Sequence, residues 1–283
     1  YNNLDVTNIE FSSTLTVGLG QAYSTITDAI NAASEGDTIV VQSGKYTEDI
    51  YIDKSLSFKG AFAGSSAVVN DANGNPQADL SGGPRGIESW INGTVTVAAD
   101  NVSIDGFRLN SENGDTPLTW DTSGVDTTTG SLVENQPLNN FSLTNSFLTG
   151  YLAGNAPSFF GGDYEGPSTA LNWSIKSNFI GGVLTDSENN GSGSLYLSGL
   201  EDSEIADNAF WRPGAAHLYV SSLTEVDITG NNFFHGLHAS GADFDGNGAE
   251  FYGGSGYGSG YGSGYGSGYG SGYGSGYGSG YGS

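Results

Sequence analysis

One short acidic motif has a spacing that suits a bound calcium ion. Asp243, Asp245 and Asn247 alternate along the chain, and a glycine follows them. Alternating oxygen ligands and then a glycine form the first half of an EF-hand calcium loop, where the glycine allows a sharp turn. Position 12 of such a loop would be Gly254, so the EF-hand pattern is incomplete, and Glu250 is the carboxylate that could replace it. Two alternatives stay open: a calcium site formed by these three residues and Glu250, or an Asp/Gly-rich turn that ends the domain.

Other titratable residues are weaker candidates for acid–base chemistry. Asp202 and Glu204 form a carboxylate pair of the kind that glycosidases use, but that mechanism depends on a separation across a cleft that the sequence does not give. His235 and His238 lie three residues apart and with Asp243 could form a metal or acid–base site, or they are unrelated surface histidines. The chain has no cysteine, which excludes a thiolate metal site, a cysteine nucleophile and disulfides.

The charge of the chain excludes two classes of partner. Acidic residues outnumber basic ones 31 to 7, giving a net charge of −24. Nucleic acids and anionic membranes bind proteins through Lys and Arg, so neither is expected as a partner. No run of 18 apolar residues is present, so no membrane span is expected. An acidic chain with no Cys or Met has few oxidisable residues, which favours an extracellular or cell-surface location.

A change of composition divides the chain into a domain at 1–252 and a low-complexity tail at 253–283. From Gly254 the tetrapeptide Gly-Ser-Gly-Tyr occurs seven times. In an extended chain every glycine of this repeat lies on one face, while Ser and Tyr alternate on the other, as in silk-like assemblies. The alternative is a flexible linker. The assembly hypothesis predicts contacts between subunits through the tyrosines of the repeat, which are Tyr257, Tyr261, Tyr265, Tyr269, Tyr273, Tyr277 and Tyr281.

Strand signals dominate the domain. Short runs of β-branched and aromatic residues are separated by Gly, Asn, Asp and Ser, and they predict strands that include 38–41, 50–52, 56–58, 95–97 and 102–104. One helix is predicted at 24–33, where Thr25 and Asp28 have the spacing of a capping box and the apolar residues share one face.

The second half of the domain contains an internal repeat. Residues 195–210 align with 218–233 at an offset of 23, and seven of the 16 aligned positions are identical. Weaker copies occur at 101–107, 140–147 and 172–179. Repeats of this length that contain only strands and turns indicate a solenoid, in which each coil buries its apolar side chains against the next.

The solenoid interpretation predicts three kinds of stacking. Asn208 and Asn231 are expected at turns, in a left-handed backbone conformation, with hydrogen bonds to their equivalents in neighbouring coils. Phe210 and Phe233 should stack on one another. The aligned aliphatic residues should form a ladder inside the coil, and they are Ile104, Leu143, Ile175, Ile205 and Ile228.

Two segments resemble a known family. The run Gly36-Asp37-Thr38-Ile39-Val40-Val41-Gln42-Ser43-Gly44-Lys45-Tyr46-Thr47-Glu48, within residues 23–60, is similar to the first coils of right-handed parallel β-helix proteins of the pectin-lyase-like superfamily. Residues 94–107 are similar to an internal coil of that family. The resemblance covers about residues 14 to 245. It implies an all-β, right-handed parallel β-helix whose short N-terminal helix caps the solenoid, followed by the Gly-Ser-Gly-Tyr tail.

The family's catalytic motifs are not matched. The Gly-His-Gly and paired-aspartate motifs of polygalacturonases are missing, and the basic residues that a pectate lyase needs are few and scattered. Trp211, Arg212 and Pro213 are similar to the Arg-Pro-Trp element of pectin methylesterases, but their order differs and the paired aspartates of that family are not recognisable. No catalytic residue is assigned, and the sequence favours a non-catalytic role without excluding an enzyme.

Two hypotheses of different classes follow. The first is a secreted or cell-surface structural protein that assembles with copies of itself into a filament, sheath or matrix through its tail. The alternative is a carbohydrate-binding or carbohydrate-active β-helix, similar to a polysaccharide lyase, a hydrolase or a phage tailspike, with a polysaccharide as partner. Calcium is the one cofactor that the sequence indicates. Aromatic residues that either stack on sugars or belong to the coil ladder are Trp173, Tyr196, Trp211 and Tyr219.

Overall fold

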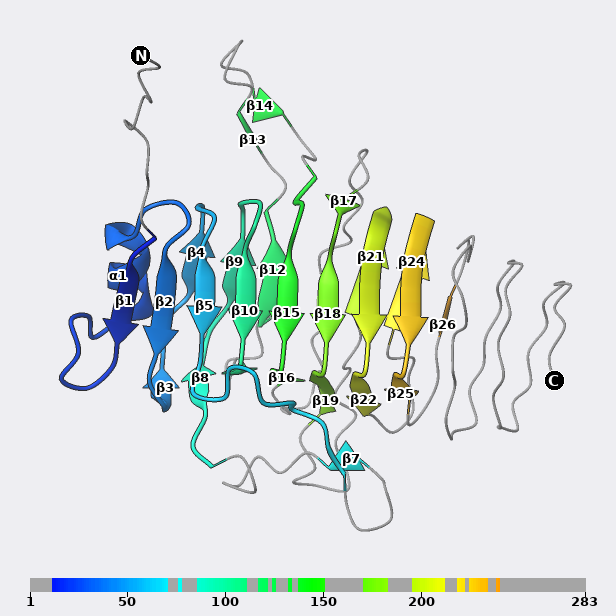
Figure 1. Cartoon of the computed structure of the whole chain (residues 1–283), viewed down its shortest axis with the longest axis horizontal. Helices are drawn as coiled ribbons and strands as arrows, with labels where there is room; N and C mark the ends of the chain where they lie inside the picture. Colours follow the sequence, from blue (N-terminus) through cyan, green and yellow to red (C-terminus); the bar gives the residue numbers. More distant parts are fainter. Residues whose placement is uncertain are drawn as a thin grey trace, which may run out of the picture.

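The computed structural model describes residues 12–70, 76–77, 86–110, 117–121, 124–125, 132–133, 137–150, 170–182, 195–211, 218–221, 224–233 and 238–239. Strands stacked side by side form an elongated body, and the helix α1 (Ile26–Ala32) lies at one end of it (Figure 1).

Two long sheets run along this body. Sheet A is parallel and contains, in spatial order, β1 (Thr14–Val17), β2 (Thr38–Val41), β5 (Ser57–Lys59), β10 (Ser103–Asp105), β15 (Ser142–Thr144), β18 (Ser174–Lys176) and β21 (Leu200–Ala206), and β21 also pairs with β17 (Ala170–Leu171) and β24 (Thr224–Thr229). Sheet B is also parallel and contains β3 (Gly44–Tyr46), β8 (Ser89–Ile91), β11 (Phe107–Leu109), β16 (Phe147–Gly150), β19 (Phe179–Gly182), β22 (Ala209–Trp211) and β25 (Asn232–Phe233).

Shorter sheets complete the coils. Sheet C contains β4 (Ile50–Ile52), β9 (Val95–Val97) and β12 (Leu118–Trp120), all parallel. A second short parallel sheet contains β20 (Leu195–Ser198), β23 (Leu218–Ser221) and β26 (His238–Ala239). Two antiparallel pairs are formed by β6 (Val69–Asn70) with β7 (Pro76–Gln77), and by β13 (Gly124–Val125) with β14 (Leu132–Val133).

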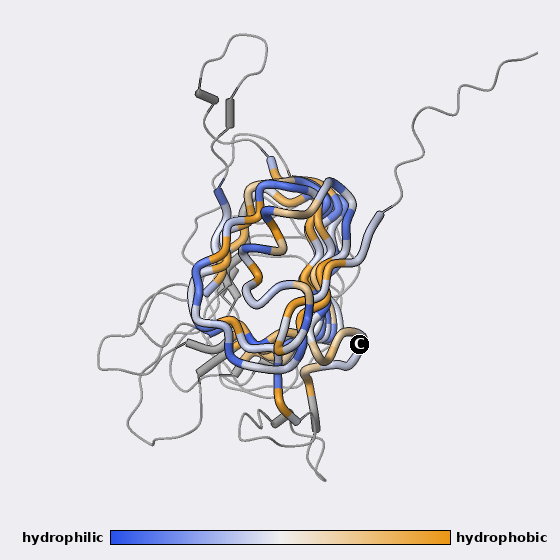
Figure 2. Tube along the Cα trace, turned by 90° about the vertical axis from the view of Figure 1, so that its left-hand side faces the viewer, coloured by the Kyte–Doolittle hydropathy of each residue, from blue (hydrophilic) through white to orange (hydrophobic). Residues whose placement is uncertain are grey.

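The chain therefore visits the sheets in turn, and each strand pairs in parallel with its equivalent in the neighbouring coil. Viewed along the long axis, successive coils overlie one another around a common interior (Figure 2). This is the right-handed parallel β-helix that the sequence predicts, with the helix at its N-terminal end. The predicted strands at 38–41, 50–52 and 95–97 are β2, β4 and β9.

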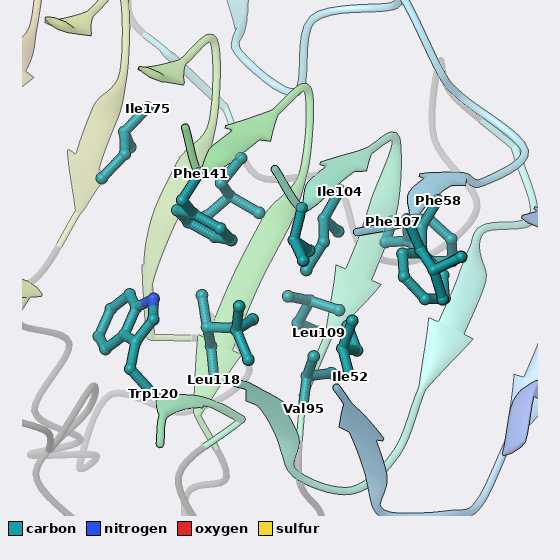
Figure 3. Close-up of a cluster of buried hydrophobic side chains, with 14 of the residues drawn as sticks. Ile52, Phe58, Val95, Ile104, Phe107, Leu109, Leu118, Trp120, Phe141 and Ile175 are labelled. Carbon is teal, nitrogen blue, oxygen red and sulfur yellow. The ribbon is translucent and has the colours of Figure 1, made fainter. Parts of the chain in front are cut away.

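The interior is filled by stacked apolar side chains. The predicted aliphatic ladder is confirmed: Ile104 pairs with Leu143, Leu143 with Ile175, Ile175 with Ile205, and Ile205 with Ile228, all buried. Side chains from facing sheets meet in the centre of the coil (Figure 3). Burying one such side chain contributes about 1.5–3 kcal/mol relative to leaving it exposed, so the ladder accounts for much of the driving force for stacking. The predicted register of the two similar repeats is also confirmed, since Leu195 pairs with Leu218.

A buried asparagine ladder runs along the corner between sheets A and B. Oδ1 of Asn208 accepts from the backbone N–H and from Nδ2 of Asn178, both at 3.0 Å, and Oδ1 of Asn231 does the same for Asn208, at 3.0 and 2.9 Å. The predicted hydrogen bonds between coils are thus confirmed. The predicted left-handed conformation of Asn208 and Asn231 is wrong, because the residues that precede them, Asp207 and Gly230, have the positive φ of 54° and 62°. The asparagine side chains can then turn inward toward the next coil. Phe210 and Phe233 occupy paired register positions.

Helix α1 is held at both ends by side chains from the coil beneath it. Thr25 is its N-cap and accepts from the backbone N–H of Asp28, as predicted, although the helix is shorter than the predicted 24–33. The carboxylate of Glu48 accepts from the first free N–H groups, those of Ile26 and Thr27, both at 2.9 Å. At the other end, Nζ of Lys54 donates to the carbonyls of Ile30 and Ala33 at 2.8 and 2.9 Å. These bonds satisfy backbone groups that a helix leaves unpaired.

A segment at residues 60–70, here called the strap, lies along the outside of the corner between sheets A and B and crosses several coils (Figure 1). Its backbone donates to the carbonyls of Asp105, Gly106 and Ser177. Ala67, in the strap, is fully buried and packs on the outward-facing apolar residues Phe147, Phe179 and Ala209 of sheet B. The strap therefore covers part of an apolar outer face.

Candidate functional site

Sheet C presents a half-exposed tyrosine on its outer face. In β4 the flanking Ile50 and Ile52 point into the core, so alternation along the strand places Tyr51 outside, where 51% of it is exposed. Tyr51 shares one register row with the half-buried Thr96 of β9 and Thr119 of β12.

The hydroxyl of Tyr51 reaches across the whole sheet. It donates a 2.7 Å hydrogen bond to Oδ2 of Asp121, which directly follows β12. Tyr51 lies in β4 and Asp121 follows β12, which are the two outer strands of sheet C, and two interstrand spacings amount to about 10 Å. A side chain that projected straight away from the sheet could not span this distance. The ring of Tyr51 therefore extends along the sheet surface, over the middle strand β9, and it is held there by the bond at its far end.

Negative charge surrounds this hydroxyl. The hydrogen bond to Asp121 raises the pKa of Tyr51 to about 12, and partial burial and the charges of Asp121 and Asp53 act in the same direction. The phenol therefore stays protonated in neutral and mildly alkaline solution, and it remains a hydrogen-bond donor to Asp121 there. The result is an aromatic ring held in one orientation, with Asp121 and Asp53 near its hydroxyl and with Thr96 and Thr119 in the same register row.

Sheet B carries an outward-facing row in which two cations stack on one aromatic ring. Trp90 pairs with Lys45 of β3 on one side and with Arg108 of β11 on the other. Lys45 Nζ lies 4.3 Å and Arg108 Cζ 3.9 Å from the centre of the Trp90 ring. The two cations come from the strands on either side of Trp90, which is half-buried. The row stabilises the outer surface of sheet B by cation–π contacts.

Sheet A presents a mostly hydroxylated outer face. Ser57, Ser103, Ser142 and Ser174 stand in one register row over four neighbouring strands, and Glu204 continues it. The candidate carboxylate pair Asp202 and Glu204 lies at this end. Glu204 is engaged by Lys176, whose Nζ lies 2.9 Å from its Oε1 and 3.0 Å from its Oε2. Asp202 is exposed and has a positive φ of 49°, so it sits at a local bend of β21.

Of the aromatic residues considered for sugar stacking, Trp173 belongs to the core. It is 1% exposed, its ring lies 5.0 Å from that of Phe141 and 5.3 Å from that of Trp120, and its Nε1 donates to the carbonyl of Leu138. Tyr196 and Tyr219 occupy one register row, which His238 of β26 continues. Trp211 ends β22 and pairs with Gly181.

Several candidates from the sequence lie outside the described residues. These are the calcium ligands Asp243, Asp245, Asn247 and Glu250, together with Arg212, His235 and the tail tyrosines from Tyr257 to Tyr281. The calcium site and the assembly through the tail therefore stay predictions. Within the part of the chain that the structure describes, no group of three or more His, Cys, Asp or Glu residues is arranged to hold a metal ion. In the same part, no helix is long and apolar enough to cross a bilayer.

Sequence patterns alone do not single out Tyr51 and Asp121 as a site. The alternation Ile50-Tyr51-Ile52 indicates that a tyrosine faces outward, and this signal was available. The sequence gives no such signal for the hydrogen bond to Asp121, because this bond depends on the register of three strands that are separated by insertions of different length.

Comparison with known proteins gives only distant similarities to solved structures. No protein-family model matches the sequence, and no curated protein matches it. Among solved structures, a mutant pectin methylesterase in complex with a hexasaccharide is 12% identical, with a TM-score of 0.35 and coverage of 91% of this chain and 81% of that one. A pectin methylesterase in complex with another hexasaccharide is 12% identical, with a TM-score of 0.33 and coverage of 89% and 90%.

Pectin methylesterase PemA from Erwinia chrysanthemi is also 12% identical, with a TM-score of 0.31 and coverage of 90% of this chain and 71% of that one. Such low identities and TM-scores give no information about activity. The strand pairing of the chain itself defines its class: coils of parallel strands stacked in register form a right-handed parallel β-helix.

Proposed function

We propose that the protein is a carbohydrate-binding β-helix that holds a saccharide on the outer face of sheet C. The observation that carries this proposal is the position of Tyr51, which is 51% exposed and extends along the sheet because its hydroxyl is bound to Asp121. An aromatic ring fixed in one place loses little conformational entropy on binding, and its face attracts the C–H groups of a sugar ring.

Polar groups around Tyr51 complement the hydroxyls of a sugar. Thr96 and Thr119 stand in the same row and offer hydroxyl groups that donate and accept. Asp53 and Asp121 offer carboxylate oxygens, which accept charge-assisted hydrogen bonds from sugar hydroxyls. An aromatic surface with a few convergent polar groups is the usual composition of a saccharide-sized binding site.

The proposal concerns binding and assigns no catalytic residue. A shallow surface with one exposed ring supports weak binding to a single sugar, with a Kd of about 1 mM corresponding to −4.1 kcal/mol. Several coils side by side would let a polysaccharide make additional contacts along the solenoid.

The test is affinity electrophoresis of the full chain in gels that contain soluble polysaccharides, with the Tyr51→Ala variant beside it. We expect at least one polysaccharide to retard the wild-type protein and the variant to lose most of that retardation. Leu19→Ala is the control, because Leu19 is 99% exposed and belongs to none of the strands of sheet C. Equal retardation of wild type and Tyr51→Ala would refute the proposed surface.

A further inference from the structure

We infer that the ligand of the Tyr51 surface is a neutral polysaccharide and not a polyuronate. This inference rests on the proposed function and specifies the chemical class of its ligand. It follows from the distribution of charge over the described residues.

Carboxylates border the Tyr51 surface at both ends of the strands of sheet C. Asp121 binds the phenol, and Asp53 follows β4 and is exposed. Asp49 precedes the same strand, with its Oδ1 accepting from the backbone N–H of Thr94 at 2.8 Å. Three carboxylates thus lie around the two ends of the strands of sheet C, within a chain whose net charge is −24.

Positive charge is placed elsewhere. Within the described ranges, the strands of sheet C contain no Lys or Arg. Lys54 is the nearest in sequence, and its ammonium group binds the carbonyls at the end of α1. Lys45 and Arg108 stack on Trp90 in sheet B, Lys176 binds Glu204 in sheet A, and Lys59 is an exposed residue of β5 in sheet A. No described cation is therefore placed to compensate an anionic ligand on the face of sheet C.

This distribution distinguishes two kinds of glycan. A polyuronate carries a negative charge on each sugar, and bringing that charge beside Asp53 and Asp121 is opposed by repulsion over a Debye length of about 8–10 Å. A neutral glycan meets the same carboxylates as hydrogen-bond acceptors for its hydroxyls, and these bonds are stronger than those between neutral groups. The acidic residues thus exclude one class of glycan and favour the other.

The experiment uses affinity electrophoresis of the full chain with galactomannan, mixed-linkage β-glucan and xylan as neutral probes and polygalacturonate as the anionic probe. We expect retardation by at least one neutral probe and none by polygalacturonate. Tyr51→Ala should weaken binding of the neutral probe about tenfold or more, which corresponds to 1.4 kcal/mol.

A charge reversal tests the electrostatic part separately. Asp53→Lys places a cation beside the Tyr51 surface, and we expect this variant to gain retardation by polygalacturonate at low salt and to lose it at high salt. Asp227→Lys is the matched control, because it makes the same charge change at an exposed position of sheet A. The control should not gain polygalacturonate binding.

The outcomes separate the two claims. If wild type binds polygalacturonate and Tyr51→Ala does not, the inference about neutral ligands is overturned while the proposed function stands. If neither the neutral probes nor polygalacturonate retards the wild-type protein, the proposed function itself fails. If Asp53→Lys and Asp227→Lys gain polygalacturonate binding equally, local charge does not select the ligand and the inference is overturned.

Discussion

The hydroxyl of Tyr51 donates a 2.7 Å hydrogen bond to Asp121, which lies 70 residues further along the chain. The bond joins the two outer strands of sheet C, and the aromatic ring spans the strand between them. A single bond therefore both links separate coils of the solenoid and fixes the orientation of the most exposed tyrosine side chain on this face. Both effects can be measured.

The link should show a specific dependence on alkaline pH. The pKa of Tyr51 is raised from 10.0 to about 12 in the folded protein. Because the folded value lies above the unfolded one, the stabilisation by this bond is complete below pH 10 and is lost as the pH rises toward 12. We expect the difference in free energy of unfolding between wild type and Tyr51→Phe, measured in urea, to shrink over this interval. A difference that stays constant from pH 9 to pH 12 would contradict the assignment.

An opposite pH dependence is expected for Asp37, next to the capping helix. The backbone N–H groups of Ser34 and Ser13 bind its two carboxylate oxygens at 2.8 and 2.6 Å and hold its pKa below the usual 3.8. Its stabilisation is therefore present above pH 3.8 and is lost as the pH falls through the lower folded value. Asp37→Asn should be less stable than wild type at pH 7, and the gap should narrow below pH 4. A gap that widens in acid would show that Asp37 does not act in this way.

The buried asparagine ladder should contribute more to the free energy of unfolding than the exposed asparagine ladder does. Asn208→Ala leaves the backbone N–H of Asn178 and the carbonyl of Ile175 without their partners in a buried place, and we expect a loss of about 3 kcal/mol in the free energy of unfolding. Asn172 is part of an exposed ladder and has a positive φ of 59°, so Asn172→Gly keeps its backbone conformation. This control should cost less than about 1 kcal/mol. Similar losses for both variants would mean that burial does not set the contribution.

The strap should depend on the glycine over which it passes. Gly106 and Gly36 both have positive φ, 79° and 82°, so replacement by alanine strains the backbone at both. At Gly106 the added Cβ would also overlap the backbone of Phe62 and Ala63, whereas the space around Gly36 is open. Gly106→Ala should therefore be the more destabilising by about 1–3 kcal/mol, with increased amide exchange in the strap. Equal losses would indicate that the strap is not held closely against this turn.

Local sequence patterns determine the stacking positions of the coils and the start of the helix. Ile175, Ile205 and Ile228 could be aligned because each coil repeats the same inward position, and the register follows from that alignment. The start of α1 at Thr25 could be predicted from cap spacing. Its clamp by Glu48 and Lys54 could not, because both side chains reach back from the following coil.

The candidate site shows the limit of such patterns. The outward position of Tyr51 follows from simple alternation, yet its orientation depends on Asp121, and the chain between them makes two further passes through sheet C with insertions between the strands. At the corner, residue preference alone predicts the left-handed conformation one position too late. Asn is common in that conformation, but here Asp207 and Gly230 adopt it so that Asn208 and Asn231 can bind the next coil.

The most direct test of the central claim is to observe Tyr51 itself while a glycan binds. The full chain labelled with ¹³C in the tyrosine rings would be titrated with the neutral polysaccharide that retards it most, and the Tyr51 signals would be assigned from Tyr51→Phe. We expect these signals to shift in a saturable manner. The signals of Tyr46, a half-buried residue whose hydroxyl donates to the carbonyl of Gln42, should stay in place. Unchanged Tyr51 signals at a glycan concentration that saturates binding would contradict the account.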